Sequence, residues 1–210
     1  MAIFKRAGTI LLTGVATAAL IGLSVPSLAG ATTATTFKVS PGGKITATAG
    51  KTTLKDTKTG TTLSCKSSKA SGTLKKGSGL AGAGIGSITA LSFTTCTGPL
   101  GLTFTVKSAN FPWKLNAVSK GGGVTHGNIS GIHATLSGPS CKATVDGTGS
   151  TKHNGKVNVT YTNSTGILKV LTTGGNLHIY GVQGCAGLVH NNDASTFSGS
   201  YKVSPKQTIT

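Results

Sequence analysis

Acidic residues are almost absent from this chain of 210 residues, which contains three Asp and no Glu. Glycoside hydrolysis ordinarily needs two carboxylates beside the scissile bond, and a calcium site needs several acidic ligands close together. Asp56, Asp146 and Asp193 are far apart in the sequence. Their small number and wide spacing argue against both kinds of site.

Arg is equally scarce, because Arg6 is the one Arg in the sequence. Recognition of phosphates and base edges depends on bidentate Arg contacts, so we do not expect sequence-specific nucleic-acid binding. The net charge is +17 at pH 7, and removing Lys5 and Arg6 leaves +15. Such a charge attracts an anionic cell-wall polymer or surface protein, although solubility and protection of strand edges explain it equally well. The densest group of candidate anion-binding residues comprises Lys38, Lys44, Lys51, Lys55, Lys58, Lys66, Lys69, Lys75 and Lys76.

The usual catalytic and metal-binding motifs are also missing. G-x-S-x-G, H-E-x-x-H and C-x-x-C do not occur, which removes the common signatures of serine hydrolases, zinc proteases and zinc ribbons. A formal G-x-G-x-x-G match at 77–82 lacks the surrounding strand–helix–strand unit that nucleotide binding needs. His190 lies near Asp193, and we interpret this pair as part of a polar loop. We therefore expect no catalytic residue, cofactor or metal, and a hydrolase without a recognisable motif is an alternative.

The first residues have the order of an export signal. Lys5 and Arg6 precede an uncharged apolar stretch at 7–23, Pro26 ends it, and small residues at Ala29 and Ala31 suit cleavage. This order predicts a signal peptide over 1–31 and a secreted, extracellular or cell-wall-associated domain over 32–210. An uncleaved membrane anchor is the alternative. No later segment approaches the roughly 20 apolar residues that a spanning helix needs.

Cysteine usage agrees with export, because all four cysteines lie within 32–210: Cys65, Cys96, Cys141 and Cys185. An even number of cysteines in an oxidising compartment implies two disulfides, and four cysteines allow three pairings. The residues around Cys65 resemble those around Cys141, and those around Cys96 resemble those around Cys185. Two related halves, 32–120 and 121–210, would each contain one bridge, Cys65–Cys96 and Cys141–Cys185. Chance similarity in a chain rich in Thr, Ser and Gly is the alternative.

Apolar and polar residues alternate with a period of two in the segments 102–107, 113–117, 157–162, 177–180 and 197–203. Gly, Pro, Asn and Asp turn signals separate these segments, and no helical stripe follows 1–31. The pattern predicts an all-β fold, either an antiparallel β-sandwich or a flattened β-barrel, with a core of small aliphatic residues because aromatics are few. The segment 37–41 (FKVSP) echoes 201–205 (YKVSP), which predicts equivalent strands that lie close in space.

Two further features are candidate contact sites. The segment 78–87 is apolar, rich in Gly and uncharged, which suits either a loop packed across the core or a loop that touches a membrane or partner. Trp113, the one Trp, is a candidate ligand contact or a core anchor.

The chain resembles a group of uncharacterised secreted proteins from Streptomyces-like actinobacteria. The resemblance rests on the motifs at 59–65 (TGTTLSC), 77–88 (GSGLAGAGIGSI), 96–100 (CTGPL), 131–134 (GIHA), 161–163 (YTN) and 201–205 (YKVSP). It implies export from a Gram-positive cell and supplies no catalytic set.

Together these features predict a secreted, non-enzymatic extracellular or cell-envelope protein that binds anionic polymer through its Lys residues. A membrane-active, toxin-like β protein that uses 78–87 is a further alternative.

Overall fold

The computed structural model describes residues 35–210, so the predicted signal peptide at 1–31 lies outside the described residues. Within them the chain forms strands and one short 3-10 turn, with no α-helix. The elements are β1 (Thr36–Ser40), β2 (Gly43–Ala49), β3 (Thr52–Asp56), β4 (Thr62–Leu74), β5 (Gly77–Ala81), β6 (Gly86–Thr97), η1 (Pro99–Gly101), β7 (Thr103–Ala109), β8 (Trp113–Gly121), β9 (Val124–Ser137), β10 (Lys142–Asp146), β11 (Gly155–Thr162), β12 (Ile167–Val170), β13 (His178–Gln183), β14 (Asp193–Ser204) and β15 (Thr208–Ile209). The predicted all-β fold is confirmed.

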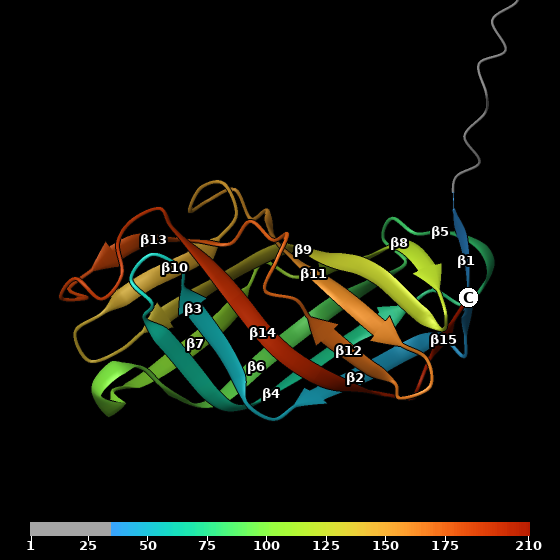
Figure 1. Ribbon diagram of the computed structural model, residues 1–210, viewed down its shortest axis with the longest axis horizontal. Coiled ribbons are helices and arrows are strands. Elements are labelled where there is room, and N and C mark those ends of the chain that lie inside the picture. The colour runs from blue at the N-terminus through green and yellow to red at the C-terminus, as the bar shows by residue number, and fades with distance from the viewer. Residues whose placement is uncertain (1–34) are drawn as a thin grey trace, which may run out of the picture. The chain divides into compact units, whose positions relative to one another are not determined.

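The strands close into a barrel, in which every ladder is antiparallel (Figure 1). One ring runs β14, β2, β4, β6, β8, β9, β11, β12 and back to β14. A second ring runs β14, β3, β4, β6, β7, β9, β10, β13 and back to β14. The long strands β4, β6, β9 and β14 belong to both rings, and short strands fill the positions between them. Of the two predicted architectures, the closed barrel is therefore the one that forms.

A small sheet of β15, β1 and β5 lies beside the first ring and covers its end (Figure 1). Its apolar side chains join those of the ring in one buried cluster that contains Phe37, Val39, Ile85, Tyr161, Val203 and Ile209. The predicted proximity of the two echoing segments is confirmed, since Val39 of the first and Val203 of the second lie in this cluster. They are not equivalent strands, because the first belongs to β1 of the small sheet and the second to the end of β14 in the barrel. The Gln207 side chain joins them further, because its Oε1 accepts a hydrogen bond from the Gly42 backbone N–H at 2.8 Å.

Both disulfides belong to the second ring. Cys65 of β4 pairs in register with Cys96 of β6, and the two form one bridge. Cys141, just before β10, bonds to Cys185, just after β13. The pairing expected from the internal similarity is confirmed. Each ring nevertheless takes strands from both predicted halves, because β14 pairs with β2 and β3.

Candidate functional site

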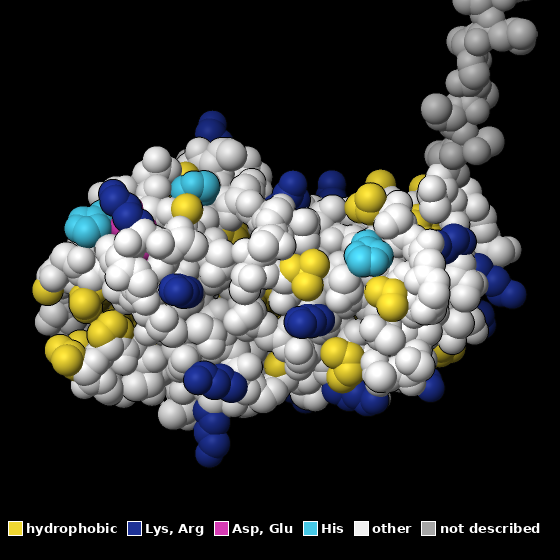
Figure 2. Space-filling view, viewed as in Figure 1, with side chains coloured by type: hydrophobic (Ala, Val, Ile, Leu, Met, Phe, Trp, Pro, Cys, Tyr) yellow, Lys and Arg dark blue, Asp and Glu magenta, His cyan; other side chains and the backbone are white. Residues whose placement is uncertain are grey.

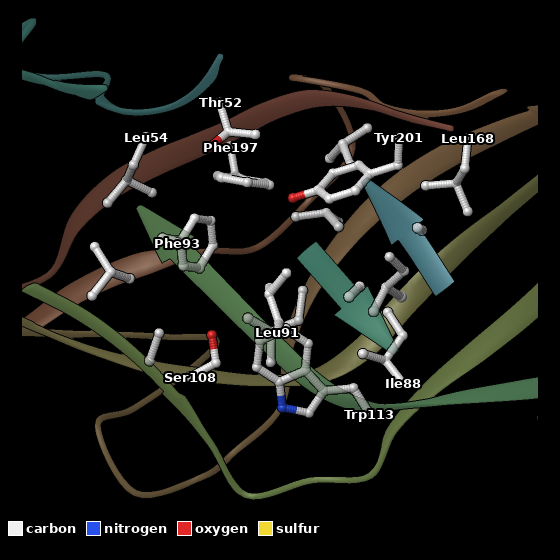
Figure 3. A pocket seen from close by; sticks show the side chains of 18 of the residues that line it. Thr52, Leu54, Ile88, Leu91, Phe93, Ser108, Trp113, Leu168, Phe197 and Tyr201 are labelled. Carbon is white, nitrogen blue, oxygen red and sulfur yellow. The ribbon is translucent and has the colours of Figure 1, made fainter. Parts of the chain in front are cut away.

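The inside of the barrel contains an apolar cavity of about 120 Å³ (Figure 3). Its wall includes large side chains such as Leu91, Phe93 and Trp113, but Ala70 and Ala134 also face it. A barrel of eight strand positions has an interior that side chains fill completely or that holds one small ligand. The small side chains leave this interior partly empty, as expected for a chain with few aromatic residues.

Trp113, a candidate contact, forms part of the cavity wall. It is 3% exposed, so it does not present its ring to a ligand outside the barrel. Its indole N–H donates a hydrogen bond to the carbonyl oxygen of Ala109 at 2.9 Å, and its ring stacks on Phe111 with the centroids 4.8 Å apart. The core-anchor interpretation therefore describes its position.

Four residues in the cavity wall carry a hydroxyl group: Thr52, Ser71, Ser108 and Tyr201. Thr52, Ser108 and Tyr201 are labelled in Figure 3. The Oγ atoms of Thr52 and Ser108 are buried and have no hydrogen-bond partner among the described residues. The hydroxyl of Tyr201 accepts a hydrogen bond from Ser68 Oγ at 2.8 Å, and burial raises the pKa of Tyr201 to about 12. A buried hydroxyl without a partner costs about 1–3 kcal/mol, so a ligand that bonded to one would recover part of that cost.

A second, smaller cavity of about 40 Å³ lies beside the first. Leu54, Leu63 and Leu136 line both cavities, so these side chains separate them. Pro99 and Leu188, from the segments that follow β6 and β13, also line the smaller cavity. It therefore lies between the barrel interior and the loops at the disulfide end.

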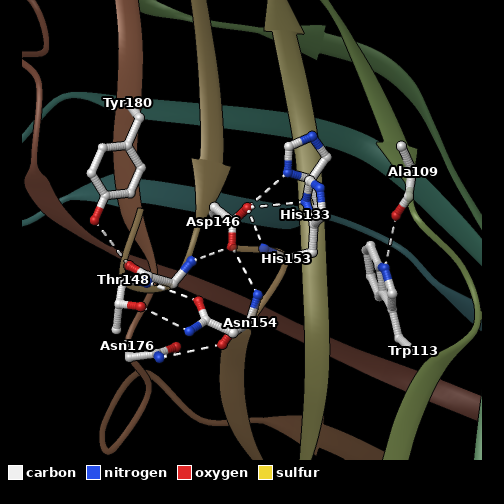
Figure 4. A network of polar contacts seen from close by, with 10 residues as sticks. Ala109, Trp113, His133, Asp146, Thr148, His153, Asn154, Asn176 and Tyr180 are labelled. Carbon is white, nitrogen blue, oxygen red and sulfur yellow. Dashed lines mark hydrogen bonds and ion pairs between the residues drawn. The ribbon is translucent and has the colours of Figure 1, made fainter. Parts of the chain in front are cut away.

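A polar cluster on the wall of the barrel centres on Asp146, whose side chain is fully buried (Figure 4). Asp146 Oδ1 accepts hydrogen bonds from the backbone N–H groups of Gly147, at 2.6 Å, and Asn154, at 3.0 Å. Asp146 Oδ2 lies 2.9 Å from His133 Nδ1 and 3.4 Å from His153 Nδ1, and it accepts a bond from the His153 backbone N–H at 3.0 Å. Burial acts to raise the pKa of Asp146, but these hydrogen bonds outweigh it and hold that pKa below its ordinary value.

The sequence-predicted polar loop around His190 forms as a separate cluster. His190 Nδ1 lies 3.1 Å from Asp193 Oδ2, and Lys58 Nζ lies 3.4 Å from Asp193 Oδ1. Burial acts to raise the pKa of Asp193, but its contacts with His190, Asp56 and Lys58 lower it below the ordinary value. His190 and Asp193 do not line either cavity, and neither do Asp146 and its two histidines. The linings of the two cavities contain no histidine.

The candidate Lys residues do not gather in one patch. Lys38 lies in β1 of the small sheet, whereas Lys55 lies in β3 of the second ring. In the view of Figure 2, Lys side chains are scattered over the whole face. The acidic side chains behave differently, because Asp56, Asp146 and Asp193 are all at most 3% exposed. The described surface therefore carries many cationic side chains and almost no exposed carboxylate side chain.

The Gly-rich segment 78–87 packs against the barrel. Part of it forms β5, which pairs with β1. Ile85 is buried in the cluster of the small sheet, and Leu80 packs against the same cluster. Gly82 approaches the backbone of β8 so closely that an added Cβ would collide with the Ala117 carbonyl oxygen. The larger aliphatic side chains of the segment thus face inward, as the packed-loop interpretation requires.

No family model, curated protein or solved structure matches this chain. The resemblance to secreted actinobacterial proteins therefore stays a prediction. Among the described residues, no helix is long and apolar enough to cross a membrane. Two disulfides are consistent with an oxidising compartment.

Proposed function

We propose that this is a secreted, non-enzymatic binding protein whose barrel interior holds a small apolar molecule with one polar group. The cavity of about 120 Å³ carries this proposal. An engineered apolar cavity of about 150 Å³ in another protein stays free of water and binds benzene. The cavity here thus suits a ligand no larger than a single aromatic ring or a short alkyl chain.

The hydroxyl groups in the wall specify the polar part of the ligand. Thr52 and Ser108 lie on opposite sides of the cavity in Figure 3, and each lacks a partner. A ligand hydroxyl that reached either one would form a hydrogen bond where water is excluded, which is worth about 1 kcal/mol net. Phenol should therefore bind several times more tightly than benzene.

Thermal denaturation in the presence of benzene, phenol and a short alcohol tests this proposal. A ligand at 100 times its Kd stabilises the folded state by about 2.7 kcal/mol, which corresponds to a rise in Tm of roughly 5–10 °C for a domain of this size. Thr52→Val and Ser108→Ala should each retain benzene binding, and the one that faces the ligand hydroxyl should lose the preference for phenol. The proposal fails if none of the three compounds raises Tm.

A second candidate function, binding of anionic envelope polymer, is supported by the burial of every Asp side chain. Attraction between Lys residues and a polyanion is not opposed by nearby surface carboxylates, apart from the Lys58–Asp193 pair. Such binding releases counterions and is screened by salt, so it should weaken steeply as salt rises.

Retention on isolated Gram-positive cell walls, compared with retention on a neutral polysaccharide, measures this second function. The expected result is retention on the walls alone, lost after a tenfold rise in salt. Protein with acetylated Lys residues is the control, because acetylation removes the charge. Retention that does not depend on salt, or no retention at all, would contradict this second function. The positive charge would then serve solubility.

A further inference from the structure

Three side chains from separate segments meet on the barrel wall beside β9. His133 belongs to β9, Asp146 ends β10, and His153 precedes β11. One ligand atom from each lies within 4.8 Å of the others. The two imidazole rings are perpendicular, with their centroids 4.5 Å apart, and both turn toward the same carboxylate oxygen (Figure 4).

The two distances from Asp146 to the histidine nitrogens are close to those between ligands of one metal ion. Zn²⁺ binds His nitrogen and carboxylate oxygen at about 2.0–2.2 Å, which places neighbouring ligand atoms roughly 3.0–3.5 Å apart. Asp146 Oδ2 lies 2.9 Å from His133 Nδ1 and 3.4 Å from His153 Nδ1. A hydrogen-bonded His–Asp pair accounts for the first distance. The backbone N–H of His153 also bonds to Oδ2 and holds residue 153 beside this oxygen, so that a second imidazole nitrogen converges on it.

The surrounding loop holds these groups in place. The Asn154 side chain accepts a hydrogen bond from the Thr148 backbone N–H at 2.9 Å and donates one to Thr148 Oγ1 at 2.8 Å. The Tyr180 hydroxyl donates to the carbonyl oxygen of Gly147 at 3.1 Å. His153 has a positive φ of 50°, a conformation that non-glycine residues seldom adopt. Such local strain persists where the surroundings fix it, and here it accompanies the turn of the imidazole toward Asp146.

We propose that His133, Asp146 and His153 bind a divalent transition-metal ion of the Zn²⁺ type. Two imidazole nitrogens and one carboxylate oxygen suit Zn²⁺, whereas Ca²⁺ and Mg²⁺ prefer ligand sets made of oxygen alone. Solvent completes the coordination, because the His153 side chain is 43% exposed and leaves the site accessible. Sequence analysis predicted no metal site, since no ligand motif with a short spacing is present.

The replacement His153→Asn separates this proposal from a purely structural role of Asp146. Asn tolerates a positive φ, and the backbone N–H of residue 153 remains available to Asp146. A structural cluster therefore survives the change, whereas a metal site loses one of its three protein ligands. The matched control is His190→Asn, because His190 lies 3.1 Å from Asp193 and is 55% exposed, but its cluster is not one of the three-ligand groups among the described residues.

Calorimetric titration of the metal-free protein with Zn²⁺, together with thermal denaturation, provides the test. We expect one Zn²⁺ per chain and a rise in Tm of about 5–10 °C at 100 times the Kd. His153→Asn should weaken Zn²⁺ binding at least about 100-fold, since changes even to groups behind the ligands cost 10–100-fold. Its Tm without metal should stay close to that of the wild type.

Substitution of Co²⁺ for Zn²⁺ adds a spectroscopic readout, because the visible absorption of bound Co²⁺ reports nitrogen and oxygen coordination and should disappear in His153→Asn. The proposal is overturned if the wild type binds Zn²⁺ no more tightly than His153→Asn does. It is also overturned if His190→Asn weakens binding to the same extent, since Zn²⁺ would then be held by dispersed surface histidines. Neither result bears on the barrel cavity, whose lining contains none of these residues.

Discussion

Replacing Ala70 with Leu should stabilise the protein if the barrel interior is partly empty. Ala70 lies on β4 and faces the cavity of about 120 Å³. Three added carbon atoms fit in this space, because a slightly larger cavity in another protein admits the six carbons of benzene. Burial of about 0.8 kcal/mol per carbon gives roughly 2.4 kcal/mol, from which about 0.5–1 kcal/mol is lost as rotamer entropy of Leu. The expected gain is about 1.5 kcal/mol.

The cost of the cavity itself gives an independent upper limit to this gain. At about 24 cal/mol per Å³, a cavity of this volume costs roughly 3 kcal/mol, and a single Leu fills only part of it. Chemical denaturation should therefore show a higher midpoint with an unchanged slope, and Tm should rise by roughly 3–6 °C. Benzene and phenol should bind the variant weakly or not at all.

Ala90→Leu provides the matched control, because Ala90 lies on the neighbouring strand β6 but is exposed. Its effect should stay within about 0.5 kcal/mol of zero, as is usual for surface substitutions. The reasoning is refuted if Ala70→Leu destabilises the protein by 1 kcal/mol or more. A loss of that size is the cost of overpacking and would mean that the space near β4 is already filled.

Three further outcomes follow from individual residues. Burial keeps the pKa of Tyr201 near 12 in the folded state, so the stability that this group contributes is complete below about pH 10 and is lost as pH rises toward 12. Tyr201→Phe should reduce this alkaline loss by up to about 3 kcal/mol in denaturant titrations. The pKa of Asp146 is lowered, so its stabilisation is present at neutral pH and lost as pH falls through the folded-state pKa, which lies below 3.8. Asp146→Asn should therefore lose about 2 kcal/mol at pH 7, and the difference should shrink in acid; a constant difference would contradict the assignment. Replacing Cys141 and Cys185 together with Ser should cost about 4 kcal/mol, since this bridge closes a loop with a sequence separation of 44.

Local sequence patterns predicted the strands well where one face is buried. Val157, Val159 and Tyr161 were expected to share the inner face of a strand, and all three are buried in β11. The expected strand at 102–107 begins one residue later, and Leu102 is 39% exposed. The alternation of apolar and polar residues reflects which side chains are buried and therefore predicts strands. It does not predict which strands pair.

Closure of the barrel was beyond such patterns for a physical reason. A sandwich and a barrel need the same alternation, and they differ in the pairing of strands that are distant in sequence. Here β14, near the end of the chain, pairs with β2 and β3 near its beginning. The echo between 37–41 and 201–205 predicted that the two ends of the chain lie close together. It did not predict the ladders of β14 with β2 and β3 that close the rings. The cavity was equally hidden, because it depends on the sum of all inward side-chain volumes.

The proposed metal site could not be derived from the turn signals. Gly138-Pro139 is a turn signal in the sequence, and a hairpin centred on it would place His133 opposite Thr144. In the observed register Ala134 pairs with Val145, so the hairpin is centred one residue later, and His133 and Asp146 are the next facing positions. A turn signal alone therefore does not fix the register that brings these two residues together. The third ligand, His153, was equally out of reach. Its approach depends on the fold of the loop 147–154 around the Asp146 carboxylate, where backbone N–H groups rather than side-chain types determine the shape.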